Sequence, residues 1–75
     1  MKITIKLIGP FIYAAGFSEK EFEAPLSATV ESLFGLVGIE KDRPKIVTRN
    51  GKAVGPVDEL QDGDRVVISP LYSGG

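Results

Sequence analysis

The sequence contains no cysteine, no histidine and no tryptophan among its 75 residues. The lack of cysteine excludes disulfides and a thiolate nucleophile, and the lack of histidine removes the side chain that most often transfers protons near neutral pH. A zinc site would have to use carboxylates alone, although zinc prefers nitrogen and sulfur ligands. We therefore expect a protein that is not an enzyme and that binds neither a metal nor another cofactor.

The sequence also lacks an excess of charge of either sign and a long hydrophobic run. Nine basic residues face ten acidic ones, and the net charge of −1 gives no field strong enough to attract nucleic acid or a membrane surface. The segment MKITIKLIG has no signal-peptide core, and no stretch approaches the ~18 apolar residues that span a bilayer. We expect a cytoplasmic protein with no nucleic acid and no membrane among its partners.

The spacing of apolar residues predicts five strands and one main helix in a single domain. Alternation of apolar and polar residues indicates strands over residues 2–8 and 18–24. Further strands are predicted over residues 45–49, 52–54 and 65–69. The main helix is predicted within residues 26–38, and its apolar stripe at positions i, i+3, i+4 and i+7 consists of Val30, Leu33, Phe34 and Val37.

Glycine and its neighbours mark the ends of these elements. Asn50-Gly51 predicts a two-residue hairpin, and Gly38 stands where a left-handed helix terminator belongs. The segment GPFIYAAG, residues 9–16, predicts a short helical turn, with Phe11 and Tyr13 packed beneath it. The dense β-branched run over residues 65–69 indicates a central strand buried on both faces.

The order of the elements is strand, strand, helix, strand, short strand, strand. A helix stripe and one sheet bury their apolar faces against each other, which gives a two-layer α+β sandwich. If the first and last strands lie adjacent and parallel at the centre, the fold is a ubiquitin-like β-grasp, a mixed sheet on one main helix. We expect this domain to span residues 1–70, with residues 71–75 as a flexible, extended C-terminal Gly-Gly tail.

Acidic residues are concentrated in VDELQDGDR, residues 57–65. This segment lacks the ligand spacing of a calcium loop, so an Asp62-Gly63 turn into the last strand is the favoured interpretation. Three glutamates alternate along the second predicted strand, which is typical of a solvated face. They are Glu19, Glu21 and Glu23.

The last six residues, PLYSGG, form the candidate functional segment. Glycine has no side chain, so a narrow tunnel in another protein can admit this backbone and present the terminal carboxylate to a reagent. A carboxylate is inert until activated, so the partner would first join it to AMP and then exchange AMP for a nucleophile. The alternative is a frayed terminus without function. The tail-docking candidates are Pro70, Leu71, Tyr72, Ser73 and Gly74, and the candidate covalent attachment site is Gly75.

The chain resembles the ThiS/MoaD family of ubiquitin-like sulfur carriers. The resemblance rests on the run Leu60-x-Asp62-Gly63-Asp64-x-Val66, on Pro70 just after the last strand and on the Gly74-Gly75 end. It covers essentially the whole chain. The segment GPFIYAAG between the first two strands is similar to the MoaD branch, the small subunit of molybdopterin synthase.

The resemblance implies a cycle in which the chain is a protein cosubstrate that binds no cofactor. An E1-like adenylyltransferase of the MoeB or ThiF type would use ATP to adenylate Gly75. A cysteine desulfurase or rhodanese would then supply sulfur and leave a C-terminal thiocarboxylate. In the MoaD branch, the tail enters a MoaE-type large subunit and delivers sulfur to precursor Z during molybdenum or tungsten cofactor biosynthesis.

Other hypotheses stay open at this point. Relatives of the family join the same end to lysines, so the chain is alternatively a ubiquitin-like modifier. A ThiS-like carrier would instead serve thiamine thiazole synthesis. A β-grasp domain that binds partners without covalent chemistry is the remaining alternative.

Overall fold

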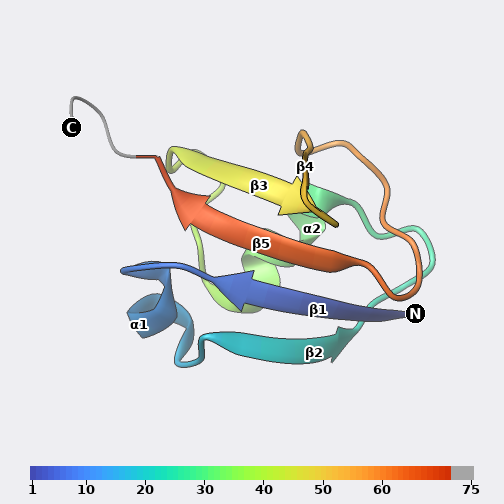
Figure 1. The fold of residues 1–75 in the computed structure, drawn as a ribbon, viewed down its shortest axis with the longest axis horizontal. Helices are drawn as coiled ribbons and strands as arrows, with labels where there is room; N and C mark the ends of the chain where they lie inside the picture. Colours follow the sequence, from blue (N-terminus) through green and yellow to red (C-terminus); the bar gives the residue numbers. More distant parts are fainter. Residues whose placement is uncertain (72–75) are drawn as a thin grey trace.

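The computed structural model describes residues 1–71 and contains five strands and two helices (Figure 1). The predictions for Tyr72, Ser73, Gly74 and Gly75 lie outside the described residues. In chain order, the elements are β1 (Lys2–Leu7), α1 (Phe11–Ala15), β2 (Glu19–Glu23), α2 (Val30–Val37), β3 (Lys45–Arg49), β4 (Lys52–Ala53) and β5 (Arg65–Pro70). Neither of these helices is long and apolar enough to cross a membrane.

One mixed sheet holds all five strands in the order β2-β1-β5-β3-β4. The first and last strands are parallel neighbours at its centre, and the other pairs are antiparallel. Figure 1 shows α2 behind the sheet and the other face of the sheet open toward the viewer. The predicted α+β class and ubiquitin-like β-grasp are confirmed.

The main helix lies within its predicted range and ends at the predicted glycine. Thr29 precedes the first turn, and the Ser32 hydroxyl accepts a hydrogen bond from the Thr29 N–H at 3.2 Å. Gly38 ends the helix with a left-handed φ of 72°, which costs glycine nothing. The four residues of the predicted stripe are all buried against the sheet, at the spacing that places them on one side of a helix.

The core lies between α2 and the inward side of the central strands. Ile3 and Ile5 of β1 and Val66 and Ile68 of β5 are completely buried. Burial of each such side chain contributes about 1.5–3 kcal/mol to folding. The central position of β5 is confirmed, but its predicted burial on both faces is wrong. Val67 is only half-buried, because none of residues 1–71 forms a second layer over the open face.

Two predicted turns are present and fix the strand register. Asn50 and Gly51 have φ angles of 52° and 85°, the positive values that a two-residue hairpin turn needs. Gly63 has a φ of 86° and donates its N–H to the Lys2 carbonyl at 2.8 Å. Asp62 accepts the Lys2 N–H at 2.6 Å, so the Asp-Gly turn ties the start of β1 to the approach of β5.

The short helix α1 follows Pro10 and ends at Gly16, as predicted. Phe11 is completely buried, but Tyr13 is 88% exposed, so its predicted packing beneath the segment is wrong. A helix of five residues turns only one side toward the core. That side carries Phe11, with Ile12 and Ala15 partly buried against the core.

Candidate functional site

The candidate site begins where β5 ends. Pro70 was predicted to lie just after the last strand, but it is the last residue of that strand and pairs with Lys45 of β3. The Leu71 N–H donates to the Pro44 carbonyl at 3.3 Å. The backbone is therefore held beside β3 as far as Leu71, one residue beyond the predicted domain boundary.

Three exposed apolar side chains lie near the end of β5. Ile8 is 38% exposed, Ile46 is 45% exposed and Leu71 is 54% exposed. Ile46 pairs with Ser69, and Ile8 follows Leu7, which pairs with Ile68. Alternation along the strands turns all three toward the open face. We call these residues the open-face patch.

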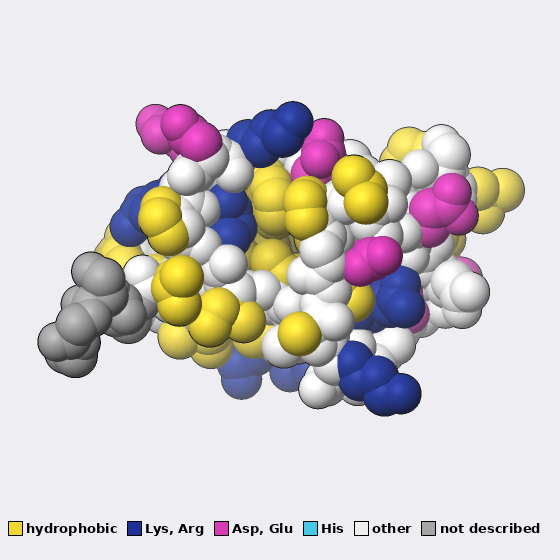
Figure 2. Space-filling model, turned by 90° about the horizontal axis from the view of Figure 1, so that it is seen from above, with side chains coloured by type: hydrophobic (Ala, Val, Ile, Leu, Met, Phe, Trp, Pro, Cys, Tyr) yellow, Lys and Arg dark blue, Asp and Glu magenta, His cyan; other side chains and the backbone are white. Residues whose placement is uncertain are grey.

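The position of the patch follows from the sheet topology. The parallel strands β1 and β5 both end where antiparallel β3 begins (Figure 1). Figure 2 shows hydrophobic side chains gathered at the same end of the molecule. Contiguous exposed apolar side chains on a small protein typically mark a docking surface.

The opposite edge of the open face is charged and internally paired. The Arg65 guanidinium donates to Glu19 at 2.7 Å, Lys2 lies 3.9 Å from Glu21, and the terminal ammonium lies 3.4 Å from Glu23. All three glutamates are exposed, which agrees with the predicted solvated face. Exposed pairs contribute about 0–1 kcal/mol each, so this edge resists strand addition more than it stabilises the fold.

The acidic segment before β5 has a structural role. Asp64 is buried and accepts hydrogen bonds from Asn50 Nδ2 at 3.0 Å and from the Gln61 N–H at 2.7 Å. Asp58 accepts the Gly55 N–H at 2.7 Å. No cluster of three metal-ligating side chains occurs within residues 1–71. The turn interpretation of this segment is supported, because Asp58 and Asp64 accept hydrogen bonds from nearby backbone N–H groups and Asp64 also accepts one from Asn50.

Sequence reasoning missed Ile8 and Ile46. Ile46 occupies an outward position in β3, and Ile8 directly follows the end of β1; the inward residues of both strands drew attention as core. The available signal was a β-branched apolar residue at an outward position beside the last strand, in KIVTR. Its partner strand was not assigned from sequence, so the two isoleucines could not be placed next to Leu71.

Comparisons with known proteins place the chain in a family and find the same fold in solved structures. The sequence model of the ThiS family matches residues 5–75. Comparison with curated protein sequences finds no match. Solved structures with the same fold include a Pyrococcus furiosus protein assigned as molybdopterin-converting factor subunit 1. The two are 28% identical, the match covers 96% of this chain and 99% of that chain, and the TM-score is 0.80.

Two further structures represent different roles on this fold. A Caldiarchaeum subterraneum ubiquitin is 26% identical over 100% of this chain and 98% of that chain, with a TM-score of 0.64. The complex of subunits 1 and 2 of molybdopterin-converting factor from Helicobacter pylori contains a chain that is 18% identical. That match covers 100% of both chains with a TM-score of 0.65.

Proposed function

Because the chain belongs to the ThiS family of small ubiquitin-like sulfur carriers, we propose that it carries sulfur as a thiocarboxylate at Gly75. The observation that carries this proposal is the family match, which extends through residue 75. The position of the tail also supports the proposal, since the tail begins at the end of β5, beside the open-face patch. The chain acts as a protein cosubstrate, and the catalytic groups belong to its partners.

The first step is activation of the terminal carboxylate. A carboxylate oxygen attacks the α-phosphorus of ATP, pyrophosphate leaves, and an acyl-adenylate forms on Gly75. An E1-like adenylyltransferase of the MoeB or ThiF type supplies the ATP site. The terminal sulfur of a persulfide on a cysteine desulfurase or rhodanese then attacks the carbonyl carbon, AMP leaves, and an acyl disulfide forms. A second thiol attacks the donor's sulfur in this acyl disulfide, which releases the thiocarboxylate and leaves the two thiols joined as a disulfide.

Docking positions the tail for this chemistry. The open-face patch contacts the partner beside the tail, and the hydrogen bond from the Leu71 N–H to the Pro44 carbonyl holds the start of the tail beside β3. Tyr72 and Ser73 then anchor the extended segment, and Gly74 passes through a channel too narrow for side chains. Apolar anchors of this kind contribute about 1–3 kcal/mol each to docking.

We propose molybdopterin synthesis as the destination of the sulfur. The Pyrococcus furiosus structure, at 28% identity over nearly the whole chain, is assigned as a molybdopterin-converting factor subunit. The Helicobacter pylori complex joins a chain of this fold to a second subunit. A MoaE-type large subunit is therefore the proposed acceptor of the loaded tail.

A second candidate function is protein modification. The Caldiarchaeum subterraneum ubiquitin shares 26% identity with this chain over its full length. In this role, a lysine amine attacks the activated carbonyl of Gly75, AMP leaves, and an isopeptide bond forms. A ThiS-like role in thiamine thiazole synthesis uses the same thiocarboxylate with a different acceptor.

Intact-mass analysis tests the carrier function. The protein is incubated with an E1-like adenylyltransferase, ATP, a persulfide source and a thiol reductant, beside a variant that lacks Gly75. We expect a mass gain equal to replacement of one oxygen by sulfur, in the full chain only. Lysine adducts in cell extract that require Gly75, without thiocarboxylate, would favour the modifier function instead.

A further inference from the structure

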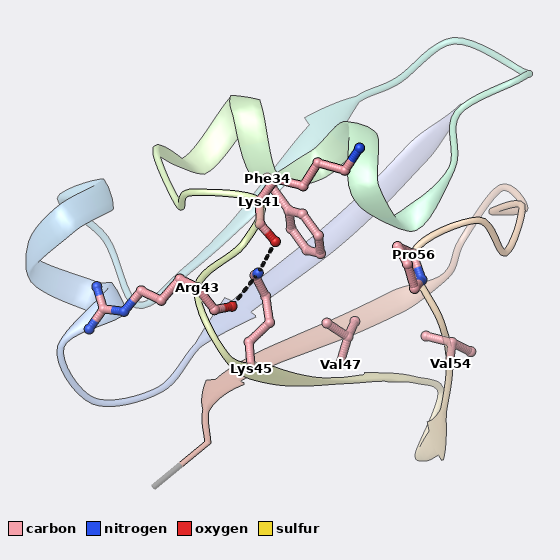
Figure 3. A pocket seen from close by; sticks show the side chains of 7 residues that line it. All are labelled: Phe34, Lys41, Arg43, Lys45, Val47, Val54 and Pro56. Carbon is pink, nitrogen blue, oxygen red and sulfur yellow. Dashed lines mark hydrogen bonds between the residues drawn. The ribbon is translucent and has the colours of Figure 1, made fainter. Parts of the chain in front are cut away.

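A groove lies on the helix-covered side of the sheet, away from the open-face patch. Its volume is about 240 Å³, and it opens between α2, the loop that follows α2, β3 and the segment after β4 (Figure 3). The lining residues are Phe34, Lys41, Arg43, Lys45, Val47, Val54 and Pro56.

The floor of the groove is apolar. The Phe34 ring from α2 and Val47 from β3 are buried, and Val54 and Pro56 form the wall opposite the loop. In Figure 2, hydrophobic side chains lie between basic ones on the face seen from above. An apolar floor of this kind suits a large aliphatic or aromatic side chain.

One wall of the groove carries a fixed ammonium group. Lys45 Nζ donates to the Lys41 carbonyl at 2.9 Å and to the Arg43 carbonyl at 2.6 Å, as the dashed lines in Figure 3 show. It lies 4.4 Å from the centre of the Phe34 ring. A lysine ammonium has three N–H donors, so one is left without a partner among residues 1–71.

The surroundings of this ammonium favour a carboxylate as its next partner. Desolvation by burial lowers the pKa of Lys45, although Asp42 opposes the shift. An anion bound at the remaining N–H would offset the desolvation and form a charge-assisted hydrogen bond.

The other two cationic side chains of the lining, Lys41 and Arg43, lie further from the floor of the groove than Lys45 does. Lys41 reaches across Phe34 to the rim, and its Nζ lies 3.4 Å from a Glu31 oxygen. Such a surface pair contributes little and exchanges readily for another carboxylate. The Arg43 guanidinium points away from the groove and lies 4.7 Å from the Phe11 ring centre. Lys41 and Lys45 are therefore the two ammonium groups available to a ligand.

We propose that this groove is a second docking site, separate from the open-face patch, for a protein segment that presents a large apolar side chain beside a carboxylate. Its volume is below the range of about 300–1,000 Å³ typical of small-molecule pockets, and fits one side chain of a partner. The charge of Lys41 and Lys45 selects an acidic segment. Because Ile46 and Val47 point to opposite sides of β3, the groove stays accessible while the tail is held at the patch.

Peptide titration followed by NMR tests this site on the full chain. The probe is acetyl-Asp-Phe-Asp-amide, and the matched control peptide has asparagine in place of both aspartates. We expect saturable shifts of the Phe34, Val47 and Val54 amides, and about tenfold weaker binding of the uncharged peptide. Lys41→Glu should weaken binding of the acidic probe to a similar degree, because its side chain is 75% exposed at the rim.

A second variant controls for general charge effects. Lys52→Glu makes the same charge change on β4, outside the lining, and should leave the affinity for the acidic probe within about twofold of that of the unchanged protein. Equal affinity for both peptides, shifts confined to the open-face patch, or no saturable shift would overturn the proposal. Shifts of the groove residues that grow with protein concentration alone would also overturn it, by identifying a second copy of the chain as the occupant.

Discussion

The two faces of the sheet are built from the same strands but differ in what covers them. On the face against α2, Ile3, Ile5 and Val66 are completely buried. On the open face, Ile46 and Leu71 keep about half of their surface exposed. Because successive residues of a strand point to opposite faces, alternate positions of one strand are buried in the core or exposed on the open face. Substitutions on the two faces should therefore affect different measurements.

The largest expected effect is on the buried face. Ile5→Ala removes a completely buried side chain and should lower the free energy of unfolding by about 2–5 kcal/mol. Ile46→Ala removes the same atoms from the open face and should cost less than about 1 kcal/mol. Urea denaturation monitored by circular dichroism measures both. Equal losses would contradict the division between the faces.

An intermediate effect is expected at the first residues of the tail. Leu71→Ala or Tyr72→Ala should weaken docking to the activating enzyme by about 1–3 kcal/mol, with little change in melting temperature. Leu26→Ala is the matched control, because Leu26 is 85% exposed in the loop between β2 and α2. Calorimetric titration measures the affinities. A large loss of stability in the Leu71 variant would instead assign that residue to the core.

The smallest effect is expected at the charged edge. Glu19→Gln removes the ion pair with Arg65, in which both side chains are about half exposed. The free energy of unfolding should fall by less than about 1 kcal/mol, and the difference should shrink as salt is added. Thermal melting at low and high ionic strength measures this dependence. A loss that persists in high salt would mean that this edge stabilises the fold.

The parts of the fold that were predicted correctly depend mostly on patterns among residues close together in the sequence. The helix stripe through Leu33 and Phe34, the Asn50-Gly51 hairpin and the Asp62-Gly63 turn each depend on a few neighbouring residues. Their geometry follows from side-chain period and from the positive φ that glycine and asparagine tolerate. Leu71 was named from sequence as a tail-docking candidate because it follows directly on a recognisable strand, and its docking role stays a prediction.

The errors arose where tertiary packing decides. Tyr13 was assigned to the interior by its aromatic character, but α1 is too short to bury a second side. The β-branched run of β5 reflects its central place in the sheet, not cover on both faces, since α2 packs on one face alone. The open-face patch and the groove combine residues from separate segments, so their recognition required the strand order.

The separation of the two faces is tested most directly by thiocarboxylate formation in a variant of the open-face patch. Ile46→Glu places a charge in the patch, and its melting temperature shows whether the fold is retained. With E1-like enzyme, ATP, a persulfide source and a thiol reductant, we predict that its rate of mass gain falls at least about tenfold. Leu26→Glu should react at the rate of the unchanged protein. A folded Ile46→Glu variant that forms thiocarboxylate at the full rate would contradict the assignment of recognition to the open face.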